Sequence, residues 1–184
     1  RTKQEIILMC KIMKYNYLVS ILLFFALACK QQKTPEEVMQ FEIAKMEENL
    51  SQNAMSLNEA NGFEMLKKYD LYVQKFPQDT LVPALLFKSG ELAMTIKATN
   101  KALFYFNKLQ NNFPDYKNTP YSVFLQAFLY ESQMNDTAKA REYYNLFISK
   151  YPNHSLVKDA KASINMLGKD LNEIIKEFEA KNKE

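Results

Sequence analysis

The side chains most often used for catalysis or metal binding are few and far apart in this sequence. Its 184 residues include one histidine, His154, two cysteines, Cys10 and Cys29, and three scattered glycines. A zinc site or a nucleophilic triad needs several such groups within reach of one another, and a phosphate-binding loop needs clustered glycines. We therefore expect no catalytic residue, no metal site and no cofactor, and His154 is expected to be an exposed turn residue.

Two pairs of neighbouring carboxylates, Glu36-Glu37 and Glu47-Glu48, could suggest acid–base chemistry. Adjacent residues on a helix point about 100° apart, so neither pair can share one site. These glutamates are better explained as charges at a helix start and on a solvated helix face.

The net charge of +3 comes from the first part of the chain. Residues 1–28 hold four of the 24 basic residues and one of the 21 acidic residues, which leaves 20 of each in the remainder. Binding to nucleic acid needs a basic surface that displaces counterions from phosphates. A balanced charge predicts that this protein does not bind nucleic acid.

The N-terminal region has the pattern of a secretory signal peptide. Lys14 precedes an apolar run from Tyr17 to Cys29, and these 13 residues fall short of the roughly 20 that span a bilayer comfortably. We predict a signal peptide over residues 1–28, in which residues 1–12 are an over-extended start before Met13. A single-pass inner-membrane anchor is the alternative.

The end of this run, Ala26-Leu27-Ala28-Cys29, resembles the lipobox of bacterial lipoproteins. The resemblance implies cleavage before Cys29, a lipid on its sulfur, and a short tether over residues 29–33. Lys30 differs from the aspartate that retains such proteins at the inner membrane, so the resemblance implies an outer-membrane protein facing the periplasm. The alternatives are an inner-membrane anchor, an uncleaved anchor or a buried Cys29.

The folded domain is predicted over residues 34–184. Thr34 and Pro35 are typical of a helix start, and apolar residues recur from Val38 to Leu50 at helical spacing, which predicts an amphipathic N-terminal cap helix.

Internal repeats decide the predicted fold. Three aromatic–proline pairs end at Pro77, Pro114 and Pro152, which lie 37 and 38 residues apart. Similar residues recur at fixed distances before each proline. They are Met65, Ala102 and Ala140 twelve before it, Tyr69, Phe106 and Tyr144 eight before it, and Tyr72, Leu109 and Phe147 five before it. Each unit therefore predicts two antiparallel helices, the second closed by its proline.

These units resemble the tetratricopeptide repeat (TPR) over about residues 59–169. The match is clearest from Ala140 to Pro152 and at Gly90 and Ala127, thirteen residues after a proline. The lengthened units resemble the envelope subgroup that includes outer-membrane assembly lipoproteins and the coordinator of the Tol-Pal system. An all-α solenoid of about three helix pairs with cap helices at both ends is expected, the C-terminal cap running from Leu171 through Ile174 and Ile175 to Phe178.

The resemblance implies a non-enzymatic scaffold that binds an envelope protein or peptide in a concave groove. The family's groove positions map onto Phe87, Glu91, Met94, Tyr121, Phe124, Phe128 and Glu131. Any one of these aromatic side chains could instead belong to the core. The alternative function is an enzyme, or its accessory subunit, acting on cell-wall or outer-membrane material.

Overall fold

The structure is a computed structural model that describes residues 13, 33–52, 57–170, 172–173, 175–176 and 179. The chain divides into two units, Arg1–Met39 and Gln40–Glu184. Helices and no strands occur in the described residues, which confirms the all-α prediction. The helices are α2 (Pro35–Gln52), α3 (Glu59–Lys75), α4 (Val82–Thr95), α5 (Thr99–Asn112), α6 (Thr119–Ser132), α7 (Thr137–Lys150) and α8 (Val157–Met166).

The start of α2 confirms the helix start that was predicted at Thr34 and Pro35. The Thr34 backbone N–H donates to the Glu37 carboxylate at 2.8 Å, and the Glu37 N–H donates to the Thr34 hydroxyl at 3.2 Å. This reciprocal pair satisfies two of the N–H groups that a helix start leaves without helical partners. Cys29, residues 1–12 and 14–32, and Leu171, Ile174 and Phe178 lie outside the described residues. No helix in the described part is long and apolar enough to cross a membrane.

As predicted, the second helix of each pair ends just before one of the three aromatic–proline pairs. Helices α3, α5 and α7 stop one residue before the aromatic that precedes Pro77, Pro114 and Pro152. That aromatic adopts φ between −127° and −136°, the extended region favoured before proline. Its N–H still closes the last turn, on the carbonyls of Tyr72, Leu109 and Phe147.

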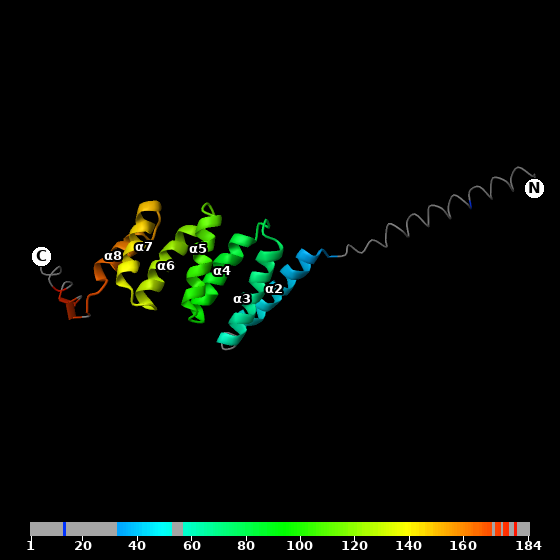
Figure 1. The fold of residues 1–184 in the computed structure, drawn as a ribbon, viewed down its shortest axis with the longest axis horizontal. Helices are drawn as coiled ribbons and strands as arrows, with labels where there is room; N and C mark the ends of the chain where they lie inside the picture. Colours follow the sequence, from blue (N-terminus) through cyan, green and yellow to red (C-terminus); the bar gives the residue numbers. More distant parts are fainter. Residues whose placement is uncertain are drawn as a thin grey trace, which may run out of the picture. The chain divides into compact units, whose positions relative to one another are not determined.

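In the second unit, consecutive helices from α3 to α8 lie side by side, and α4 also contacts α6 (Figure 1). All nine side chains at the three repeat positions are buried, so these positions form the core between the helices. The sharp turns inside the pairs use Lys97 and Asn135, whose φ values are 59° and 52°.

One close approach depends on glycine. A Cβ at Gly90 in α4 would overlap three atoms of the Phe106 ring in α5. The ring is fully buried and therefore cannot move aside. Glycine costs about 1 kcal/mol relative to alanine inside a helix, so its presence here reflects the packing of that ring.

We expect Gly90→Ala to destabilise the protein even though alanine favours helix. Overpacking of a core costs about 1 to 3 kcal/mol, which exceeds the gain in helix propensity of about 1 kcal/mol over most of that range. Thermal unfolding followed by circular dichroism measures the effect.

Gly62→Ala is the matched control. Its added Cβ would meet the Cγ2 methyl of Ile96 at 2.6 Å, but Ile96 is partly exposed at the end of α4 and can turn aside. A Gly90→Ala protein that melts above the wild type would contradict the packing assigned to Phe106.

Candidate partner-binding surface

The first helix pair consists of α2 and α3. From Gln40 onward, α2 contacts α3 through side chains: Gln40 Nε2 donates to the Tyr72 hydroxyl at 2.7 Å, and the Tyr69 hydroxyl donates to Glu47 at 2.7 Å. The helix predicted as an N-terminal cap thus also supplies the first half of a pair. The described residues form three pairs, α2–α3, α4–α5 and α6–α7, followed by α8.

A phenol–carboxylate hydrogen bond joins the two helices of the outer pairs. Tyr69 donates to Glu47 in the first pair, and Tyr144 donates to Glu131 in the third at 2.7 Å. The middle pair has Phe106 at the equivalent position and Met94 where Glu131 lies in the next repeat, so neither a hydroxyl nor an acid is present there. The polar partner appears only where the ring carries a hydroxyl.

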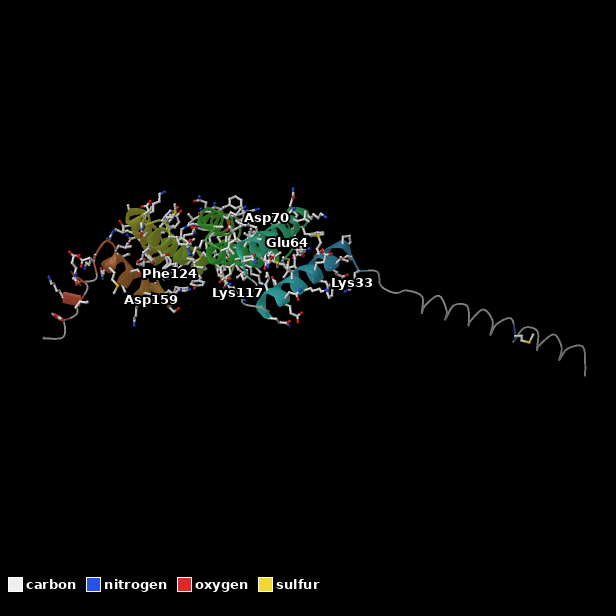
Figure 2. All side chains as sticks on the ribbon, turned by 90° about the horizontal axis from the view of Figure 1, so that it is seen from below. Lys33, Glu64, Asp70, Lys117, Phe124 and Asp159 are labelled. Carbon is white, nitrogen blue, oxygen red and sulfur yellow. The ribbon has the colours of Figure 1, made fainter. Side chains whose placement is uncertain are left out.

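A similar bond links neighbouring pairs. The Tyr105 hydroxyl in α5 donates to Asp70 Oδ2 in α3 at 2.8 Å. Figure 2 labels Asp70, which accepts this hydrogen bond, and also Phe124, which lies on α6. These hydrogen bonds hold adjacent helices in register because each joins a phenol on one helix to a carboxylate on another.

Aromatic rings in contact connect α5, α4, α6 and α7. We call this set the aromatic ladder. Its ring centroids are 6.1 Å apart for Phe106–Phe87, 6.0 Å for Phe87–Tyr121, 6.3 Å for Tyr121–Phe124, 5.4 Å for Phe124–Tyr144 and 5.6 Å for Phe124–Phe147. Tilted and edge-to-face pairs at these distances are favourable, so the ladder joins two helix pairs through one continuous apolar seam.

The ladder extends to the predicted turn histidine. The His154 ring packs edge-on against Phe147 at 5.2 Å, and its Nδ1 accepts from the Leu156 N–H at 3.2 Å. His154 is therefore half-buried and shapes the turn before α8, in contrast to the exposed position expected from the sequence. Asp79 accepts from Leu81 in the same way after the first proline.

The three groove residues predicted on α4 differ in exposure. Phe87 is only 7% exposed and lies between Phe106 and Tyr121, so it belongs to the core because ladder rings cover it. Met94 is half-buried, whereas Glu91 is exposed. Of the three, Glu91 is the most exposed.

The four groove residues predicted on α6 remain accessible. Tyr121 and Phe128 are 38% and 42% exposed. Phe124 and Glu131 are half-buried by contacts with α7. The structure thus brings these residues onto one helix beside α4, and their binding of a partner stays a prediction.

Three charged side chains, Glu47, Lys88 and Glu91, lie on α2 and α4 around one hollow. Lys88 Nζ in α4 is 2.7 Å from both carboxylate oxygens of Glu47 in α2. Glu91 is one turn along from Lys88. Both residues border a hollow of about 280 Å³ between α2, α3 and α4, whose apolar lining is Leu50, Leu57, Met65 and Leu92.

Burial raises the pKa of the Glu91 carboxyl, and the Lys88 ammonium opposes part of that rise. Burial also raises the pKa of Tyr116, in the turn before α6, and Glu91 raises it further. The Glu91 carboxyl on α4 is therefore partly desolvated and interacts with that turn.

The combination of paired helices, small residues at close approaches and a terminal proline identifies the repeat. Residues 84–116 and 121–154 both match the sequence model of the tetratricopeptide repeat. Two segments of the chain thus match the tetratricopeptide repeat. Each TPR match covers a helix pair, α4–α5 or α6–α7. A search of curated proteins returns no match.

Sequence reasoning missed the part of the surface that involves α2. Glu47, Lys88 and Tyr69 form a polar cluster there, yet Glu47 was assigned to a solvated helix face. Alignment of Ile43 with Gly90 and Ala127 would have placed Glu47 at the position of Glu131. The aromatic–proline marker cannot give that alignment because it occurs only at the end of the second helix.

Alkaline pH should weaken the fold through its buried tyrosines. Burial and then the hydrogen bonds to Asp70 and Glu131 raise the pKa values of Tyr105 and Tyr144 well above the ordinary tyrosine value. A pKa raised by folding gives stability that is complete below about pH 10 and lost above it, because the unfolded chain releases those protons first.

We expect Tyr144→Phe to reduce this loss by about 1 kcal/mol between about pH 8 and about pH 11, and Tyr105→Phe to act in the same direction. Urea unfolding at a series of pH values measures it. Curves that stay parallel to the wild type would contradict the assignment.

Proposed function

We propose that this chain is a protein-binding scaffold of the cell envelope. Tetratricopeptide repeats generally mediate protein–protein interactions, and two segments of the chain match that repeat. The binding surface proposed here consists of the exposed parts of α4 and α6, and we call it the α4–α6 face. Its occupant is an extended peptide or a helix of a partner protein, which would be held by apolar contacts.

The observation that supports this proposal is the exposure of Tyr121 and Phe128 beside a rigid seam. Tyr121 is held in place by ring contacts with Phe87 and Phe124, so it loses little freedom when a partner covers it. Large aromatic side chains that become desolvated supply much of the energy of protein interfaces.

The proposed location is the outer membrane, facing the periplasm, with a lipid on Cys29. Its support is the signal-like run that ends in Ala26-Leu27-Ala28-Cys29. A short tether would then keep the repeats near the membrane surface, where envelope proteins are available as partners.

Phe128→Ala should weaken partner capture at least tenfold and change the free energy of unfolding by less than about 1 kcal/mol, because the ring is already well exposed. Phe124→Ala should instead cost about 2 to 4 kcal/mol, since its ring packs on Tyr144 and Phe147. Capture is measured by affinity purification from detergent-solubilised envelopes, followed by titration of the purified partner.

Phe104→Ala is the matched control. Phe104 lies on α5, is 58% exposed and contributes no ring to the ladder. Its substitution should leave partner affinity unchanged. Equal capture by the wild-type and Phe128→Ala proteins at equal stability would refute the α4–α6 face as the binding surface.

Labelled palmitate should enter the wild-type protein and be absent from Cys29→Ser, because the thiol at residue 29 is the proposed attachment point. Equal labelling of the wild-type and Cys29→Ser proteins would overturn the lipid anchor, and fractionation of labelled membranes tests the outer-membrane location separately.

A further inference from the structure

The α4–α6 face has unbalanced negative charge. Lys88 pairs with Glu47 through both carboxylate oxygens and offsets only part of the pKa rise of Glu91. Glu131 accepts a hydrogen bond from the neutral phenol of Tyr144, which satisfies one oxygen and leaves the charge uncompensated. Within the described residues, no salt bridge joins Glu91 or Glu131 to a basic side chain.

Burial by a partner would make this imbalance costly. An ionised carboxylate that loses water without gaining a cation is strongly destabilised. The burial that already raises the pKa of Glu91 would increase further under a bound segment. A partner with neutral or acidic side chains at these positions would therefore bind poorly, whereas cationic side chains would compensate the carboxylates.

The apolar surroundings favour the same kind of partner. The exposed faces of the Tyr121 and Phe128 rings can accept a Lys or Arg cation, and the hollow beside Glu91 has an apolar lining suited to an aliphatic side chain. Lys and Arg have apolar stems that can lie along such rings while the charge reaches a carboxylate.

We propose that the α4–α6 face recognises a basic, apolar peptide segment, in which Lys or Arg side chains pair with Glu91 and Glu131 and neighbouring apolar side chains contact Phe128 and the hollow. This specificity rests on the proposed scaffold function. It follows from charge complementarity at the face, and it excludes acidic peptides.

A library of random peptides displayed on phage provides the probe. The full chain is immobilised, bound peptides are sequenced, and a selected peptide is synthesised with a fluorophore for anisotropy titration. We expect selected peptides to be enriched in Lys and Arg beside apolar residues and depleted in Asp and Glu. The affinity of the synthetic peptide should fall about five- to tenfold in Glu91→Gln/Glu131→Gln, and the difference should shrink at high salt.

Glu64→Gln/Glu142→Gln is the matched control. It removes the same charge from exposed positions on α3 and α7, so peptide affinity should stay within about twofold of the wild type if attraction is local. Glutamine at 131 can still accept from Tyr144, and equal thermal midpoints verify that both double variants are folded.

Three results distinguish failure of this inference from failure of the proposed function. The selected peptides could require Phe128 without being enriched in Lys or Arg, or their affinity could be unchanged in Glu91→Gln/Glu131→Gln. Either result would overturn the basic specificity and leave the scaffold proposal intact. Failure to select any peptide dependent on Phe128 overturns the face and the inference together. Concentration-dependent self-association that is lost in Phe128→Ala would assign the face to a second copy of this chain and overturn the basic peptide.

Discussion

The packing of one ring against the first helix of its pair sets the geometry of the repeats. Tyr69, Phe106 and Tyr144 occupy this position and are all buried. In the middle repeat, Gly90 approaches the Phe106 ring closely, so the separation of α4 and α5 is fixed by a contact that leaves no room for a methyl group. The proline eight residues later then ends the helix and sends the chain into the next pair.

The same ring position couples stability to polarity. A tyrosine there brings a hydroxyl into the interior, where an unsatisfied hydroxyl is costly, and the outer pairs provide Glu47 and Glu131 as acceptors. The middle pair avoids the requirement because its ring is phenylalanine. The repeats thus share one helix arrangement, in which the ring is either a tyrosine with a glutamate acceptor or a phenylalanine without one. A carboxylate occurs at the acceptor position only where the ring is a tyrosine.

Much of the fold could be predicted from the sequence because its markers act locally. Proline closes a helix through its own ring, and Thr34 caps a helix through a neighbour three residues away. Partners from distant helices could not be predicted in this way. Gln126, for example, is fully buried on α6 and donates to Gln110 on α5 at 3.3 Å, yet its Oε1 has no partner within the described residues.

The candidate surface could likewise be predicted where it depends on one helix, and could not be predicted where it depends on contacts between helices. Repeat spacing identified Tyr121 and Phe128, whose exposure depends on a register that each helix sets for itself. Phe87 was assigned to the groove by that spacing but is covered by rings from α5 and α6. The ion pair between Lys88 and Glu47 could not be predicted, because it depends on the distance between α4 and α2. Local sequence patterns contain no information on that distance.

Helix α2 has one buried residue, Ile43, although it forms one wall of the hollow beside Glu91. Its links to α3 and α4 are chiefly polar, through Gln40 and Glu47. In a linear array each element is stabilised by its neighbours alone, so a helix with little apolar burial opens at a lower free energy than a well-buried one. Transient release of α2 would enlarge the hollow while α4 to α7 stayed folded, which would make one end of the surface adjustable in width and the other end rigid.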